Sequence, residues 1–358
     1  MTIRLAFIVV IAAGCAGEFT QPTATSARRI APVKGFASVM APVSSITDFE
    51  AFSVGGINGQ YDWKSFGGSG AVSPGSHCAV YDHVIHTNDA FASVAFGALS
   101  LRISNAVTSG CYGDQTFSAR TADIAGQSGA TSLSRDGLTN FALPGAALRN
   151  HFDAEWTLRS ATPGEAQPGL EVVVSPARGD DHRMSWVRMA DLPDGLAISV
   201  ASRADASNPG AFQLVTVATG LDRSLSHSIR LTMDFVDGPG NDVVQVFVNG
   251  GLRYVGQSWE TFYALDPNGA ANFGRNPPAV NRLMFRTGSD LLRGIPGDPA
   301  PALLGKGFLF DAVRVRAFSL PRSVDDCKAG GWRDLFDSEG AAFSTQGSCV
   351  SWANAVSR

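Results

Sequence analysis

Charged residues are scarce in this chain, and the two signs are not segregated. Asp and Glu number 32 and Lys and Arg 28, which gives a formal net charge of −4 and a charged fraction of 17%. No long run of one charge occurs, and nothing resembles the clustered basic surface of a nucleic-acid-binding protein. We therefore expect no nucleic acid among the partners.

Recognisable catalytic motifs are also missing. The sequence contains no G-x-S-x-G, no H-E-x-x-H and no phosphate-binding glycine loop, so no motif names a reaction. No C-x-x-C occurs, and the spacing of His77, His83 and His86 near Cys78 fits no pair of ligands on a helix, which argues against a zinc site. Helix-period amphipathic runs are scarce, and no helices of ten or more residues separate the predicted strands, which excludes a βαβ fold.

The first residues, MTIRLAFIVVIAAGCAG, have the layout of an export signal. One cation, Arg4, precedes an apolar run over residues 5–13, which is shorter than the ~20 apolar residues of a transmembrane helix. Ala-Ala-Gly-Cys resembles the lipobox of bacterial lipoproteins. The resemblance implies a signal peptide over 1–14, a lipid on Cys15 as the sole membrane attachment, and a place at the cell envelope or surface. Plain secretion is the alternative. Residues 15–44, rich in Ala, Ser, Thr and Pro, read as a flexible tether.

The cysteines fit an oxidising compartment. If Cys15 carries the lipid, four of the five cysteines remain, which suggests two disulfides. The sequence permits three connectivities. Because each pair closes a local loop, the spacing favours Cys78–Cys111 and Cys327–Cys349.

Residues 45–320 carry many short β-rich runs, separated by Gly, Pro, Asn and Asp. Apolar and polar residues alternate in HFDAEWTL (151–158), in residues 229–235 and in residues 244–249, and strands are also predicted over 96–105, 183–189, 195–202, 282–286 and 307–318. This period of two predicts an all-β fold, a two-sheet antiparallel β-sandwich with one face of each sheet buried.

Several blocks of the chain carry a resemblance. DFVDGPGNDVVQVFVNGGLRYVG is similar to the hairpin of laminin-G and concanavalin A-like jelly rolls. DFEAFSVGGINGQYDW, GLEVVVSPARGDDHRMSWVRM and GFLFDAVRVRAF are similar to blocks of a group of bacterial secreted proteins with the same sandwich. The resemblance implies a jelly roll over 45–320 and says little about function, because this fold hosts binding modules, glycosidases, lyases and adhesion domains.

The tail, residues 321–358, resembles a short module of type C-K-x-G-G-W…F-x-x-Q-G-x-C-V-S at the ends of bacterial surface proteins. The segment is too small for a core of its own, so a Cys327–Cys349 bridge is expected to close it. A role in docking a partner is the alternative to a purely structural staple.

A calcium ion is implied by the same jelly-roll resemblance. Glycan-binding jelly rolls often carry an N-terminal F-E and a C-terminal F-x-D-x-V joined by structural calcium, and Glu50 and Asp311 match these positions. Calcium takes six to eight oxygen ligands, so main-chain carbonyls would complete the site. The alternative is that both are ordinary strand-end residues.

Asp153 and Glu155 are candidate catalytic residues. Alternation places them on one strand face about 7 Å apart, in the range of acid/base pairs in glycoside hydrolysis. Laminarinase-type glycosidases carry E-x-D-x-(x)-E on such a strand, and FDAEW lacks the first Glu. An ordinary polar outer face is the alternative.

Two further groups of residues are candidate ligand contacts. Arg183, Ser185, Gln245 and Phe247 occupy polar alternation positions, and they would form one open face if their strands shared a sheet. Arginine and an exposed aromatic ring suit a sugar, including an acidic one. Trp259 and Tyr263 lie in an aromatic stretch that predicts a binding rim or a packed loop.

The leading hypothesis is a surface lipoprotein whose jelly roll binds a polysaccharide or cell-envelope glycan without catalysis. A polysaccharide-degrading hydrolase or lyase that uses Asp153 and Glu155 is the first alternative. A structural or adhesive surface protein is the second, and it would expose an apolar patch.

Overall fold

A computed structural model describes residues 45–67, 81–88, 96–108, 114–130, 147–178, 182–203, 211–268, 277–287 and 300–356. The chain divides into two compact units, Met1–Ala37 and Ser38–Arg358, and every described residue belongs to the second. Cys15, Cys78 and Cys111 lie outside the described residues, so lipidation and a Cys78–Cys111 bridge stay predictions.

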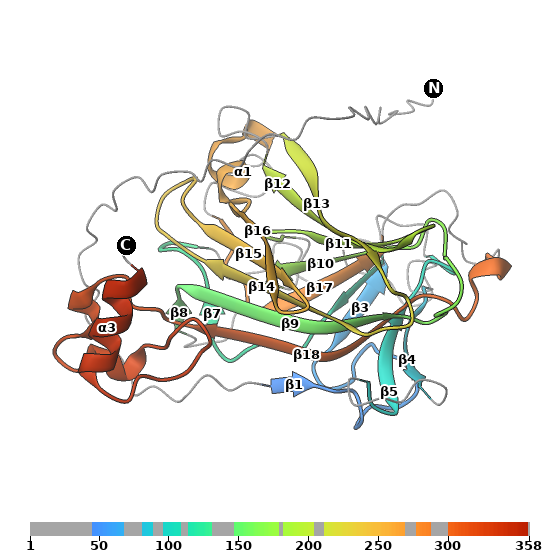
Figure 1. The fold of residues 1–358 in the computed structure, drawn as a ribbon, viewed down its shortest axis with the longest axis horizontal. Helices are drawn as coiled ribbons and strands as arrows, with labels where there is room; N and C mark the ends of the chain where they lie inside the picture. The colour runs from blue at the N-terminus through green and yellow to red at the C-terminus, as the bar shows by residue number, and fades with distance from the viewer. Residues whose placement is uncertain are drawn as a thin grey trace. The chain divides into compact units, whose positions relative to one another are not determined.

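The second unit is an antiparallel β-sandwich, as the period of two predicted (Figure 1). Its larger sheet, sheet A, has the order β16-β15-β14-β9-β18-β5-β4-β2, and β1 also pairs with β18. Its strands are β1 (Ser45–Thr47), β2 (Gly55–Gly56), β4 (His83–Thr87), β5 (Leu99–Ile103), β9 (His151–Ser160), β14 (His227–Asp234), β15 (Val243–Val248), β16 (Gly251–Gly256) and β18 (Phe308–Phe318).

The smaller sheet, sheet B, has the order β13-β12-β11-β10-β17-β6-β3. Its strands are β3 (Lys64–Gly67), β6 (Asp114–Phe117), β10 (Glu171–Ala177), β11 (Val187–Leu192), β12 (Gly195–Arg203), β13 (Phe212–Leu221) and β17 (Arg282–Thr287). Two short strands, β7 (Ile124–Ala125) and β8 (Leu148–Arg149), pair in parallel outside both sheets.

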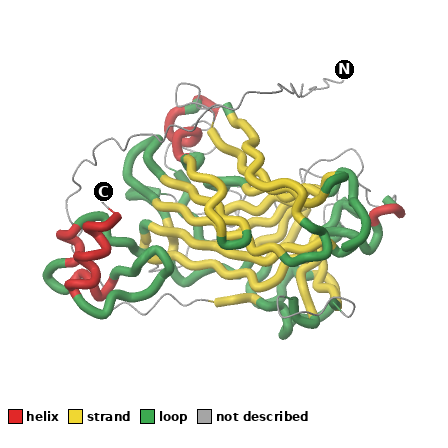
Figure 2. The backbone as a smooth tube through the Cα atoms, in the orientation of Figure 1, coloured by secondary structure: helices red, strands yellow, loops and turns green. Residues whose placement is uncertain are grey.

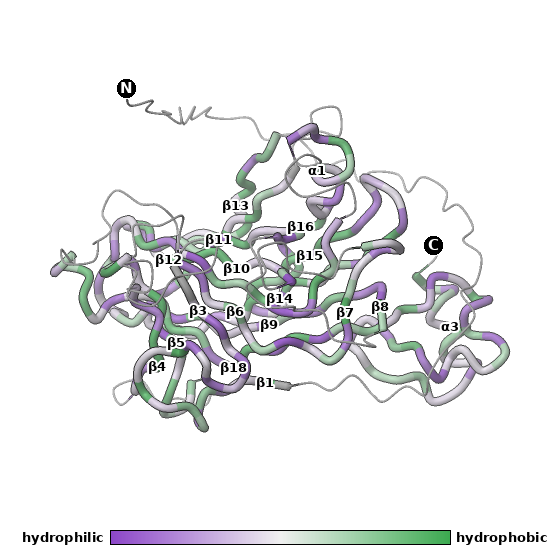
Figure 3. The backbone as a smooth tube through the Cα atoms, turned by 180° about the vertical axis from the view of Figure 1, so that it is seen from behind, coloured by the Kyte–Doolittle hydropathy of each residue, from purple (hydrophilic) through white to green (hydrophobic). Residues whose placement is uncertain are grey.

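The hydrophobic core lies between the two sheets, because alternate residues of each strand point to it. On β9, Phe152, Ala154, Trp156 and Leu158 are fully buried, and they join one cluster with the inner residues of sheet B. Hydrophilic and hydrophobic residues follow one another along these strands (Figure 3). The other face of sheet A therefore carries the polar residues of β9, β14 and β18.

Helices contribute little to this unit (Figure 2). Among the described residues, α-helices include α1 (Glu260–Leu265), after β16, and α3 (Gln346–Val356), in the tail. Short 3-10 turns there include η2 (Pro301–Leu303), η3 (Val324–Cys327) and η4 (Gly331–Asp334). Within the described part of the chain, no helix has the length and apolar character needed to cross a bilayer.

The tail is closed by a disulfide between Cys327 and Cys349, as predicted. Both cysteines are fully buried, and they pack with Ala353 and the half-buried Trp332 in a cluster separate from the sandwich core. Because this cluster is small, the tail also depends on contacts with the sandwich, where Phe336 stacks edge-on against Phe318 with ring centres 5.7 Å apart.

One predicted strand is shorter in the structure. The sequence predicted a strand over 183–189, but β11 begins only at Val187, and Arg183 forms a single bridge with Ala177. The chain turns here because the main chain of Met184 accepts a hydrogen bond from the Trp259 amide, at 2.9 Å, instead of continuing a ladder.

Candidate functional site

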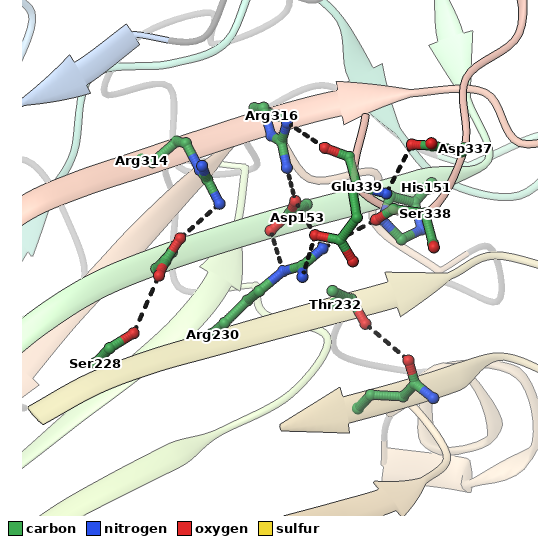
Figure 4. Close-up of polar contacts among 12 residues, drawn as sticks. His151, Asp153, Ser228, Arg230, Thr232, Arg314, Arg316, Asp337, Ser338 and Glu339 are labelled. Carbon is green, nitrogen blue, oxygen red and sulfur yellow. Dashed lines mark hydrogen bonds and ion pairs between the residues drawn. The ribbon is translucent and has the colours of Figure 1, made fainter. Parts of the chain in front are cut away.

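Asp153 and Glu155 share the outer face of sheet A, as predicted, and arginines bind both carboxylates (Figure 4). Arg230 donates to Asp153 through Nε (3.2 Å) and Nη2 (3.3 Å), and Arg316 donates to it through Nη2. Glu155 accepts from Arg314 Nη2 at 2.5 Å and from the Ser228 hydroxyl at 3.0 Å. The strand register explains these contacts. Glu155 of β9 is paired with Arg230 of β14 on one side and with Arg314 of β18 on the other, and Asp153 is paired with Arg316 of β18.

A loop of the tail, residues 336–342, covers Asp153; we call it the tail loop. Arg230 reaches the Glu339 carboxylate through Nη1 (2.7 Å) and the Ser338 carbonyl through Nη2 (2.9 Å). Arg316 donates to the Glu339 carbonyl at 2.8 Å. Asp153 is consequently 0% exposed, with both carboxylate oxygens bound to cations. In this arrangement Asp153 anchors the tail through Arg230 and Arg316, and Glu155 is held by Arg314 and Ser228.

The predicted ligand face does not form as one surface. Gln245 and Phe247 lie on β15 in sheet A, whereas Arg183 and Ser185 precede β11 of sheet B. The prediction required one shared sheet, and it fails because the two sets belong to different sheets. Ser185 is also buried, so it offers nothing to a ligand.

Arg183 is instead surrounded by aromatic rings beside α1. Its guanidinium carbon lies 5.5 Å from the ring centre of Trp186 and 5.6 Å from that of Trp259. Phe212, at the start of the edge strand β13, packs on Trp259 at 4.7 Å and is 40% exposed. We call this group the edge aromatic cluster; its members are Arg183, Trp186, Phe212, Trp259, Phe262 and Tyr263.

Main-chain contacts position the two predicted rim residues in this cluster. The indole of Trp259 donates to the Ala201 carbonyl at 3.0 Å, and the Tyr263 hydroxyl donates to the Arg183 carbonyl at 2.7 Å. Both side chains are buried. Trp259 and Tyr263 therefore form the buried base of the cluster. The surface available to a ligand consists of Phe212, which is exposed, and of Trp186 and Arg183, which are half-buried.

Two buried acids meet at the start of α1. Asp242 precedes β15 and is 1% exposed, and Glu260, the first residue of α1, is 0% exposed. Burial, and then the neighbouring Glu260, raise the pKa of Asp242 to about 8. Burial also raises the pKa of Glu260, while main-chain donors oppose that rise. The pair thus joins the turn before β15 to the start of α1, which follows Trp259 and carries Tyr263.

Gln245 and Phe247 form a second, more open area on sheet A. The Arg230 guanidinium lies 5.5 Å from the Phe247 ring centre, and the Thr232 hydroxyl donates to Gln245 Oε1 at 3.3 Å. The paired residues of β16, Leu252 and Val255, are exposed. This area is largely apolar, and its guanidinium is already bound to carboxylates.

Glu50 and Asp311 come together at the start of β5. Glu50 Oε1 accepts from the Leu99 amide and Asp311 Oδ2 from the Gly97 amide, each at 3.1 Å. Burial, followed by the charges of Glu50 and Asp48, raises the pKa of Asp311 to about 6. Within the described residues, no group of three or more His, Cys, Asp or Glu is arranged to hold a metal ion. Calcium here would depend on main-chain oxygens, and the clustered negative charge is the feature that fits it.

Sequence reasoning missed four contributors to these sites. Phe212 stands in a run without regular alternation, and its exposure at a sheet edge depends on sheet order. Asp242 and Glu260 are 18 residues apart, and nothing in the sequence brings them together. Arg316 sits at a polar alternation position of β18, which was the one available signal for its contact with Asp153.

Several solved structures are similar to this chain in fold. A sialidase aligns over 78% of this chain at 10% identity, with a TM-score of 0.40, and this chain spans only 19% of its length. An alginate lyase from Pseudomonas aeruginosa aligns over 63% of this chain and 87% of its own, at 14% identity and a TM-score of 0.35. The Emp47p carbohydrate recognition domain aligns over 77% and 97%, at 11% identity and a TM-score of 0.35. No protein-family model and no curated protein matches the chain.

Proposed function

We propose that this protein binds a polysaccharide or cell-envelope glycan at the edge aromatic cluster, without cutting it. The observation that carries the proposal is the placement of the Arg183 guanidinium over Trp186 and Trp259, next to the exposed ring of Phe212. Aromatic rings offer an apolar surface to the face of a sugar, and a guanidinium offers charge-assisted hydrogen bonds to hydroxyl or carboxylate groups.

The state of the acid pair favours binding over catalysis. A glycosidase needs one carboxyl group that donates a proton and one that acts as nucleophile or base, both reaching the substrate. Asp153 is buried beneath the tail loop between two arginines, and Glu155 is bound to Arg314. Hydrolysis or elimination by this pair would first require the tail loop to leave sheet A.

A structural calcium ion between Glu50 and Asp311 belongs to the same proposal. The two acids approach each other across the first and last segments of the sandwich, near Asp48, and no described Lys or Arg is ion-paired with them. A divalent cation would offset this negative charge and tie the segments together.

We also propose that the protein is exported and anchored by a lipid on Cys15. The proposal rests on the N-terminal sequence pattern alone. Replacing Cys15 by Ser should release the protein from membranes, whereas a Cys15→Ser protein that still carries a lipid label would contradict it.

Screening the full-length protein against neutral and acidic polysaccharides tests the glycan proposal. We expect binding without new reducing ends or unsaturated sugars, and weaker binding of the same polysaccharide by Phe212→Ala. Leu148→Ala, which shortens an exposed apolar side chain on β8, is the control and should bind as the wild type does. Products whose formation is abolished by Asp153→Asn with Glu155→Gln would favour the enzyme instead.

A further inference from the structure

We propose that Asp242 and Glu260 are positioning residues, which share one proton and thereby hold α1 in the place that the edge aromatic cluster needs to bind its ligand. This role depends on the glycan-binding function proposed above, and it adds regulation of glycan binding by pH. We infer that the cluster binds at neutral pH and loses affinity in alkaline solution.

The contacts of the two carboxyl groups place them where they can share one proton. Glu260 Oε1 accepts from the amides of Asn241 (2.6 Å) and Asp242 (3.1 Å). Asp242 accepts from the Val236 amide at 2.8 Å and from the Ser258 hydroxyl at 2.7 Å. Glu260 Oε2 is buried and makes no hydrogen bond of normal geometry to a described residue. Besides the amides of Asn241 and Asp242, the groups that act on Glu260 are the Gly240 amide and the Asp242 carboxyl. Two facing acceptors bond only if one of them is protonated.

Other charged groups around the pair do not replace that proton. Asp237, in the same turn, accepts hydrogen bonds from Ser128 and adds negative charge nearby. Asp266 stands at the end of α1, and its side chain accepts from the Asn268 amide. On the cluster side, the Arg183 guanidinium covers Trp259, and His182 stacks on Tyr263 at 6.4 Å. The largest influences on Asp242 are burial and Glu260, and no cation is among the causes of its shift.

The pair is joined directly to the cluster. Trp259 immediately precedes Glu260, and its amide donates to the Met184 carbonyl at 2.9 Å, beside Arg183. Tyr263, one turn further along α1, bonds the Arg183 main chain through its hydroxyl. Loss of the proton would place two negative charges side by side in a buried site, where they repel strongly. A shift of α1 that separates them would move Trp259 and the arginine that covers it.

Glycan affinity between pH 6.5 and 9.5 tests this role, with the polysaccharide bound best at pH 7. We expect the affinity of the wild type to fall at least tenfold across this range. Glu260→Gln should keep its affinity, because an amide retains the Oε1 acceptor and supplies a permanent donor toward Asp242. Asp242→Asn is the second neutral variant and should behave alike. Asp237→Asn, the matched control in the same turn, should lose affinity as the wild type does.

A wild type with constant affinity, or a Glu260→Gln variant that weakens in parallel with it, would overturn the proposal. Hydrogen exchange of residues 256–266, corrected for the intrinsic effect of pH, separates this outcome from failure of the glycan proposal. Even if no glycan binds, exchange should accelerate above pH 8 in the wild type and not in Glu260→Gln. Equal exchange in both proteins would contradict the shared proton whatever the ligand.

Discussion

Arg316 donates through Nη2 to the carboxylate of Asp153, and its Nη1 holds the Glu339 carbonyl of the tail loop at 2.8 Å. One side chain therefore joins an acid on the sandwich to the main chain of the tail. Arg230 makes the same connection from β14, on the other side of β9, to Asp153 and to Ser338 and Glu339. Asp153, one of the two acids that resembled a catalytic pair, thus belongs to the attachment of the C-terminal segment.

Removing one of these arginines should destabilise the protein strongly. Arg316→Ala leaves a buried carboxylate with one cation fewer, which typically costs about 3–5 kcal/mol when a buried pair is broken. We expect chemical denaturation to show a loss of this order, together with faster tryptic cleavage at Arg333. Lys306→Ala breaks an exposed pair with Glu165 and should cost about 0–1 kcal/mol. Equal effects of the two substitutions would show that the buried network contributes little.

The tail disulfide should stabilise the tail mainly by restricting the conformations of its unfolded chain. Cys327 and Cys349 are 22 residues apart, and closing a loop of this size contributes about 3 kcal/mol. Replacing both cysteines by serine should make the tail sensitive to protease while the sandwich stays folded, which limited proteolysis with mass spectrometry would show. Unchanged resistance of the tail would mean that its contacts with Phe318, Arg230 and Arg316 suffice.

Asp311 should make stability depend on pH and on calcium. Its pKa in the folded protein is raised to about 6, above the value of an unfolded aspartate. The folded state therefore holds a proton that the unfolded state has lost, and the contribution of Asp311 to stability falls as the pH rises from about 4 to about 6. Asp311→Asn should abolish this dependence of stability on pH.

Calcium should raise the melting temperature of the wild type above pH 6 and leave that of Asp311→Asn unchanged. An identical response of both proteins would eliminate the calcium site.

Much of the fold could be predicted from local patterns. Alternation in residues 151–158, 229–235 and 244–249 identified β9, β14 and β15 and their buried faces, because the period of two is set by the strand itself. The same reasoning placed Asp153 and Glu155 on one face. The spacing of the cysteines identified the Cys327–Cys349 bridge, since the two cysteines close a local loop.

The sites were harder to predict, because they depend on which strands become neighbours. Phe247 and Arg183 both occupy polar positions, but β15 and β11 lie in different sheets, and alternation carries no information about sheet membership. The cover over Asp153 comes from Glu339, more than 180 residues further along the chain. The proximity of Asp242 to Glu260 follows from the packing of α1 on the turn before β15, which no local signal encodes.

The affinity of two phenylalanine variants for one glycan tests the central claim most directly. Calorimetric titration should show that Phe212→Ala binds ten- to a hundredfold more weakly than the wild type, since losing one such contact costs about 1–3 kcal/mol. Phe247→Ala, on the outer face of sheet A, should bind as tightly as the wild type. Full affinity of Phe212→Ala, with binding lost in Phe247→Ala, would contradict the account and move the site to sheet A.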